Sequence, residues 1–104
     1  MIHRLGLGLL GALVATSVMA VEDPPAGALS CSGCHPIGSS VQTPVPRLTG
    51  RNADDLAKAM KAFKTGEAKG TIMDRIAKGF SDDEIQALAE WYARTKPPGA
   101  GDGR

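Results

Sequence analysis

The sequence has few aromatic residues and almost no net charge. Two Phe, one Trp and one Tyr are the only aromatic side chains among 104 residues. Chains below ~70–80 residues usually need a metal, a disulfide or another staple to fold stably. With so few aromatic side chains, the core of this small chain is thin, which indicates that something other than side chains fills the centre. The formal net charge of +1 excludes a general polyanion binder, so we expect no nucleic-acid partner.

Residues 1–20 contain no acidic residue and hold the longest apolar run of the chain, Leu5 to Val14, just after Arg4. Small or apolar residues precede a cut after Ala20, which is the layout of a secretory signal peptide. The alternative is an uncleaved membrane anchor, for which the 17 residues from Leu5 to Val21 are at the short end of the ~17–25 residues needed. The residue directly after the cut, Val21, is not a cysteine, so no lipoprotein anchor is expected. We therefore expect export to the periplasm, with no stable membrane insertion after cleavage.

The only two cysteines occur together, in Cys31-Ser32-Gly33-Cys34-His35. This is C-x-x-C-H, the attachment sequence for c-type haem. Two thiols three residues apart on a helical turn can each form a thioether with one vinyl group along one porphyrin edge. The imidazole that follows then lies under the iron. The motif therefore predicts one covalent haem c bound by Cys31 and Cys34, with His35 as an axial iron ligand.

Three other interpretations of the two cysteines have weaker support. A Cys31–Cys34 disulfide would close a tight loop and stabilise the chain little. A thioredoxin-like redox pair needs an α/β pattern, and no strand is evident here. A zinc site would need adjacent Cys34 and His35 to reach one tetrahedral ion, without a second ligand pair in the sequence.

Residues 53–65 are predicted to form a helix. Asn52 is a suitable N-cap, with acidic residues in the first turn, and Gly66 is a suitable C-terminal stop. Leu56, Met60 and Phe63 follow one another at helical spacing and form a single apolar stripe. Residues 66–80 are expected to combine loop with at most one helical turn.

A second long helix is predicted at 82–95, because Ser81 and Glu84 form the S-x-x-E capping box before an apolar stripe. A short helix is expected within 26–34, and residues 97–104 are expected to be a disordered tail. The sequence shows neither alternating apolar residues nor internal repeats. The predicted fold class is therefore all-α, with three to five short helices.

The second axial ligand is expected from a methionine. Met60 belongs to the apolar stripe, where a core-filling role is the default. Met73 lies in a glycine-punctuated segment expected to be a loop, which can wrap over the opposite haem face, so we predict Met73 as the ligand. An apolar loop anchor is its alternative role. Ligation by His and Met raises the reduction potential and leaves no open iron position. If Met73 were a bystander, a haem enzyme or gas sensor would be the alternative.

Taken together, C-x-x-C-H at 31–35, P-x-L-x-G at 46–50, a Met in a loop at 73 and a helix at 82–95 resemble a class I c-type cytochrome. The run from Thr71 to Ile85 is similar to the cytochrome subunit of flavocytochrome c sulfide dehydrogenase. The resemblance implies a small class I cytochrome c fold around one haem. Its domain would span 28–96 after a lead of 21–27.

The resemblance also implies site residues and partners. Cys31 and Cys34 would bind haem covalently, His35 and Met73 would ligate iron, and the Pro46 carbonyl would support the His35 ring. The protein would be a non-catalytic electron carrier. It would accept electrons from an FAD-containing flavoprotein subunit that oxidises sulfide and pass them to an acceptor such as another cytochrome. The alternative is a free soluble shuttle between respiratory or photosynthetic complexes.

Overall fold

The computed structural model describes residues 15, 22–38 and 40–97. The expected signal peptide and the expected tail lie outside the described residues, apart from Ala15 and Pro97. The described chain folds into helices alone, which confirms the all-α prediction. None of these helices, within the ranges just given, is long and apolar enough to cross a membrane. The elements are α1 (Ala28–Cys31), α2 (Ala53–Thr65), α3 (Met73–Ile76), the 3-10 turn η1 (Ala77–Gly79) and α4 (Asp82–Arg94).

Helix α2 begins and ends where its capping residues predict. The Asn52 side chain accepts a hydrogen bond from the Asp55 N–H at 3.1 Å, which satisfies one of the free amides at the helix start. At the other end Gly66 adopts a left-handed conformation (φ 82°), and its N–H donates to the Phe63 carbonyl at 3.2 Å. Glycine takes this conformation without the Cβ clash that other residues meet.

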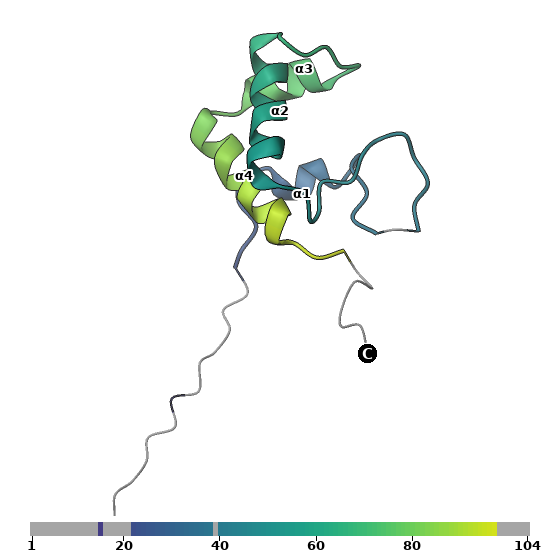
Figure 1. Ribbon diagram of the computed structural model, residues 1–104, viewed down its shortest axis with the longest axis vertical. Coiled ribbons are helices and arrows are strands. Elements are labelled where there is room, and N and C mark those ends of the chain that lie inside the picture. The colour runs from purple at the N-terminus through teal and green to yellow at the C-terminus, as the bar shows by residue number, and fades with distance from the viewer. Residues whose placement is uncertain (1–14, 16–21, 39, 98–104) are drawn as a thin grey trace, which may run out of the picture.

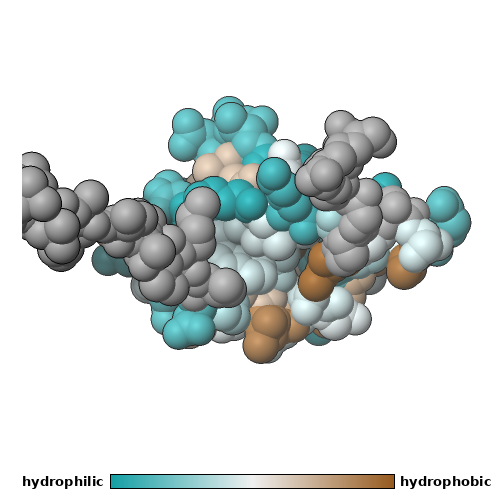
Figure 2. Space-filling model, turned by 90° about the horizontal axis from the view of Figure 1, so that it is seen from below, coloured by the Kyte–Doolittle hydropathy of each residue, from teal (hydrophilic) through white to brown (hydrophobic). Residues whose placement is uncertain are grey.

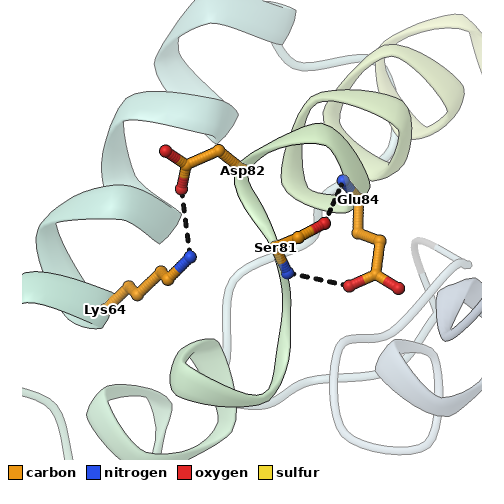
Figure 3. Close-up of polar contacts among 4 residues, drawn as sticks. All are labelled: Lys64, Ser81, Asp82 and Glu84. Atoms are coloured by element: carbon orange, nitrogen blue, oxygen red, sulfur yellow. Dashed lines mark hydrogen bonds and ion pairs between the residues drawn. The ribbon is translucent and has the colours of Figure 1, made fainter.

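Helix α4 begins with the predicted capping box (Figure 3). The Ser81 hydroxyl accepts from the Glu84 N–H at 3.1 Å, and the Glu84 carboxylate accepts from the Ser81 N–H at 2.8 Å. An ion pair between Lys64 and Asp82, 3.1 Å apart, connects the end of α2 to the start of α4. The helix ends at Arg94, one residue before the predicted end.

Helices α2 and α4 pack against each other and form the centre of the molecule (Figure 1). Their contact is made by small and branched residues, and Ile85 is the largest fully buried side chain among those described. The buried core consists of Ala28, Leu56, Ala57, Ile85, Leu88, Ala89 and Tyr92. Three of these seven residues are alanines, so the side-chain core is as thin as the aromatic count predicts.

Long-range hydrogen bonds attach the N-terminal half to α4. The Tyr92 hydroxyl donates to the Ala28 carbonyl in α1 at 2.5 Å. The Gly50 N–H donates to the Tyr92 carbonyl at 3.0 Å. Between these two attachments, residues 36–38 and 40–50 belong to a loop that projects to one side of the α2–α4 pair (Figure 1). Tyr92 therefore fixes both α1 and the end of this loop.

The segment around Met73 differs from the prediction. Met73 was expected within a loop, but it is the first residue of α3. The amides of Arg75 and Ile76 both donate to the Ile72 carbonyl, at 2.9 and 3.1 Å, which closes one helical turn. Met73 is therefore held by a turn of helix and not by free loop backbone.

Candidate functional site

A cavity of about 840 Å³ lies between α1, the loop, α2, α3 and α4. This volume falls in the ~300–1,000 Å³ range of cofactor and small-molecule sites. The wall is largely apolar, with Leu56 and Phe63 from α2, Ile72 and Ile76 from the α3 region, and Leu88 from α4. The stripe predicted from helical spacing therefore faces the cavity as well as the core.

All three chemically active residues of the C-x-x-C-H motif line the cavity. The His35 and Cys34 amides both donate to the Cys31 carbonyl, at 2.9 and 3.2 Å, so the motif continues the turn of α1. Both thiols are free, with Cys31 half-buried and Cys34 exposed. A single turn thus presents two thiols and one imidazole to the same space.

Burial raises the pKa values of two neighbouring groups, the Cys31 thiol and the Tyr92 hydroxyl. It raises the pKa of the Cys31 thiol, which donates weakly to the Gly27 carbonyl at 3.4 Å. Burial, together with the neighbouring Cys31, raises the pKa of Tyr92 to about 12. The phenol therefore stays protonated at neutral pH and can donate its hydrogen bond to Ala28.

The His35 ring is oriented by the loop. Its Nδ1 lies 2.6 Å from the Pro46 carbonyl oxygen. A carbonyl can only accept a hydrogen bond, so the proton of a neutral imidazole resides on Nδ1 and the lone pair on Nε2. Metal-binding histidines are oriented in this way, with the second ring nitrogen donating to a backbone carbonyl. Pro46 itself also lines the cavity.

Both methionines considered from the sequence line the cavity, Met60 from α2 and Met73 from the start of α3. Met60 also packs against the buried core, as expected for a stripe residue. Gly70 allows the chain before α3 to approach α2 closely, because a Cβ there would lie 3.1 Å from Phe63 Cε1 and 3.5 Å from Met73 Cβ.

Arg51 is a site residue that the sequence reasoning missed. It lines the cavity from the position directly after the P-x-L-x-G loop. Among the wall residues in the described part of the chain, it is the only one with a permanently charged side chain. The sequence signal that could have identified Arg51 is its position between the P-x-L-x-G motif at 46–50 and Asn52, the N-cap of α2.

The weaker interpretations of the cysteines find little support in the described ranges. Within residues 22–38 and 40–97, no group of three or more His, Cys, Asp or Glu side chains could hold a metal ion, so a zinc site lacks its ligand set. The same residues form no strand on which a thioredoxin-like fold could be built.

The donor set fits a haem of the c type. Two thiols on one helical turn match the two vinyl groups, and a ring nitrogen left free by the Pro46 contact suits iron. The thioether sulfurs of Met60 and Met73 belong to residues that line the same cavity. His with Met is an established axial pair for iron in c-type cytochromes. The largely apolar wall suits the porphyrin ring.

No model of a known protein family matches the chain, but curated proteins do. Over 68 residues the chain is 34% identical to cytochrome c-554(548) of Halomonas halodenitrificans, and the match covers 62% of this chain and 82% of that cytochrome. The chain belongs to the c-type cytochromes, with the small all-α class I fold. The relatives are named as cytochromes, as a cytochrome subunit and as electron acceptors.

The names of two further relatives refer to sulfur compounds. The chain is 34% identical over 64 residues to the cytochrome subunit of sulfide dehydrogenase of Chlorobaculum tepidum, with 62% of this chain and 58% of that protein covered. It is 39% identical over 67 residues to a thiosulfate dehydrogenase electron acceptor of Stutzerimonas stutzeri, with 61% of this chain and 31% of that protein covered. The chain thus spans between about a third and three fifths of the length of these two relatives.

Proposed function

We propose that this chain is an exported class I cytochrome that carries single electrons on one covalently bound haem c. The observation that carries the proposal is the common position of Cys31, Cys34, His35 and Met73 in the wall of one 840 Å³ cavity. When bound, haem supplies an iron that changes reversibly between the ferrous and ferric states.

The residues around the cavity have separate tasks in this proposal. Cys31 and Cys34 attach the cofactor, which makes its loss impossible without breaking covalent bonds. His35 would hold the iron through Nε2, because its Nδ1 lies 2.6 Å from the Pro46 carbonyl oxygen. The apolar cavity-lining residues of α2 and α3 would exclude water from the bound cofactor, which would limit the reorganisation that accompanies a change of charge.

Met73 is proposed as the second axial ligand in preference to Met60. Met60 is in the middle of α2 and already packs against the buried core, so its side chain has an established packing role. Met73 begins a one-turn helix whose approach to α2 is permitted by Gly70. This short element can place a sulfur without distorting a long helix.

The two methionines provide a matched pair of variants. In Met73→Ala we expect the thioether–iron charge-transfer band of the oxidised protein to disappear and carbon monoxide or cyanide to bind fast. Met60→Ala removes the same side chain from the same cavity and should retain the band. If Met60→Ala loses the band and Met73→Ala keeps it, the assignment of the ligand is reversed.

The proposed partner is an FAD-containing sulfide dehydrogenase subunit, with another cytochrome as a downstream acceptor. Support comes from the sulfide dehydrogenase cytochrome subunit among the relatives. The resemblance of residues 71–85 to that family, described from the sequence, points the same way. The surface seen in Figure 2 is mostly polar, and its hydrophobic areas are separate spots. Without residues 1–20, basic and acidic side chains are equal in number, unlike the one-signed surfaces that steer many free carriers.

Purification from the periplasm tests the partner and the export together. We expect an FAD protein in stoichiometric amount, haem that is reduced when sulfide is added, and an N-terminus at Val21. An isolated cytochrome that sulfide reduces no faster than an unrelated control cytochrome would favour the free shuttle. Recovery with residues 1–20 attached in a membrane fraction would contradict signal-peptide cleavage.

A further inference from the structure

Two isoleucines of the α3 region belong both to the cavity wall and to the outer surface. Ile72 and Ile76 line the cavity, yet Ile72 is 56% exposed and Ile76 39% exposed. The Ile76 N–H donates to the Ile72 carbonyl at 3.1 Å, so the two residues are one helical turn apart and lie on the same face. At this face a single layer of side chains separates the cavity from the solvent.

The same segment carries three exposed basic side chains, those of Lys69, Arg75 and Lys78. None of the three takes part in an ion pair within the described residues. Asp74 is the only carboxylate among residues 68–80, and its Oδ1 atom is buried. The surface around the two isoleucines is therefore locally positive.

The segment that carries the C-x-x-C-H motif has no such charges. Residues 24–46 contain no Lys, Arg, Asp or Glu, although Leu29 and Val41 are 69% and 54% exposed there. Three basic residues lie within three positions of Ile72 or Ile76, whereas none lies within three positions of Leu29 or Val41. Exposed apolar side chains thus occur in both segments, but a basic surrounding occurs in one of them.

The charges of the chain are equal in number but unevenly distributed. Residues 68–80 carry three basic side chains and one acidic one, whereas residues 81–97 carry four acidic and two basic ones. Charges act on an approaching protein over about one Debye length, ~10 Å at 0.1 M salt. An acidic protein is therefore attracted to the first segment and repelled by the second.

We propose that the α3 surface docks against an acidic surface of the protein that exchanges electrons with this chain; this rests on the proposed function, in which the cavity holds haem c. The α3 surface consists of Lys69, Ile72, Arg75, Ile76 and Lys78. Docking here would bury the isoleucines at the centre of the contact, and the three cations would meet carboxylates at its rim, as in other protein interfaces.

A protein partner suits this surface better than an extended polyanion. Without residues 1–20 the chain has no net positive charge to hold it on a membrane or a nucleic acid, and the positive area is small. In the exchange the partner loses one electron and the ferric iron gains it, and no bond is made or broken. The docked partner would be separated from the cavity by the isoleucine layer alone.

Flavodoxin, an acidic flavoprotein, is the probe for binding. It is titrated in its oxidised form into the ferric haem-loaded protein, so that no electron is exchanged, and amide chemical shifts are recorded by NMR. We expect the largest changes at residues 69–78, and binding that weakens with added salt although the net charge of the chain is zero. Largest changes within residues 26–34 or 40–46, or binding independent of salt, would overturn the proposal.

Arg75→Gln/Lys78→Gln and Lys58→Gln/Lys61→Gln form a matched pair. Each removes two exposed positive charges, but Lys58 and Lys61 line a separate surface pocket with Gln86 of α4 and not the cavity. At low salt we expect the first variant to weaken flavodoxin binding, and to slow one-electron reduction by flavodoxin hydroquinone, about five- to tenfold. The second should change both by about twofold or less. Equal effects would mean that attraction depends on overall charge and not on the α3 surface.

The same variants distinguish other occupants of the α3 surface. If Arg75→Gln/Lys78→Gln abolishes binding to phosphatidylglycerol vesicles but leaves flavodoxin binding unchanged, the surface meets a membrane and the proposal is wrong. Loss of a concentration-dependent dimer in that variant, again with flavodoxin binding unchanged, would assign the surface to a second copy of the chain. Intact mass of the wild type is measured first, because absence of covalent haem contradicts the proposed function itself, whereas a haem-loaded protein without changes at the α3 surface contradicts the docking alone.

Discussion

The α2–α4 pair and the remainder of the cavity wall are stabilised in different ways. Helices α2 and α4 have 13 residues each, and a side chain caps the N-terminus of each. Helices α1 and α3 have four residues each and no side-chain cap hydrogen bond. The first pair contains six of the seven residues of the buried core. Isolated four-residue helices are unstable in water, so α1 and α3 depend on contacts made elsewhere.

The short elements are held by a small number of long-range contacts. Tyr92 fixes Ala28 and Gly50, and Pro46 fixes His35. In the proposed holoprotein, residues 31–35 at the end of α1 and Met73 in α3 would hold the haem, which would give both short helices a further attachment. Local helix signals therefore determine the α2–α4 pair, called the scaffold below. The cofactor and the hydrogen bonds of Tyr92 and Pro46, called tethers, determine the remainder of the cavity wall.

Removal of the haem attachment should have the largest effect. In Cys31→Ala/Cys34→Ala we expect no covalent haem and a largely unfolded chain, because the thin core alone does not offset the conformational entropy of the wall. Circular dichroism and thermal unfolding measure this, with the haem-loaded wild type as the reference. A cooperative, native-like transition in the haem-free variant would show that the wall needs no cofactor.

Gly27→Ala should be the next most severe change. Gly27 has φ 86°, and an added Cβ would lie 2.6 Å from Phe80 Cε1. The left-handed conformation and the forced movement of Phe80 should together cost about 2–4 kcal/mol of unfolding free energy.

Gly66→Ala is the matched control in the scaffold. Gly66 has φ 82°, but no atom lies within 4 Å of an added Cβ. We expect a loss of about 1–2 kcal/mol from the backbone alone. Chemical denaturation of both haem-loaded variants compares them, and equal losses would mean that the Gly27–Phe80 packing contributes nothing.

Tyr92→Phe tests the tether between α4 and α1. It keeps the ring and removes the hydroxyl that donates to Ala28, leaving a buried carbonyl without that partner. The expected loss is about 1–2 kcal/mol in the unfolding free energy. Hydrogen exchange should increase most at the amides of Cys31, Cys34 and His35 in the wall. Uniformly faster exchange across α2 as well would indicate that Tyr92 stabilises the whole molecule and not the tether.

Ser81→Ala and Lys64→Gln test the scaffold itself and should have the smallest effects of the series. Loss of the capping box at α4 should cost about 1 kcal/mol. Lys64→Gln, which removes the neighbouring exposed ion pair to Asp82, should cost about 0.5 kcal/mol or less. Both variants should retain the visible spectrum of the haem. A change of spectrum on Ser81→Ala would show that the scaffold and the wall are not separable.

The scaffold was predictable because its signals are local. Asn52, Gly66 and the Ser81–Glu84 box lie within a few residues of the helix ends that they determine, so α2 was placed correctly and α4 to within one residue. The start of α3 at Met73 was not predicted, because a one-turn helix depends on packing against α2 more than on its own sequence.

The composition of the cavity wall was only partly predictable. C-x-x-C-H identified three of its residues directly, and helical spacing identified Met60 and Phe63. The contacts of Tyr92 with Ala28 and Gly50 join residues distant in sequence, so no local pattern encodes them. Arg51 was missed for the same reason, because a single arginine after a loop acquires meaning only when the loop is placed beside the cavity.

The most direct test of the central claim is a mass measurement on the protein purified from the periplasm. Intact mass and peptide mapping should show one haem per chain, attached to the peptide that contains Cys31 and Cys34, with neither thiol available to an alkylating reagent. A mass without haem, together with uptake of the reagent at both cysteines, would contradict the account.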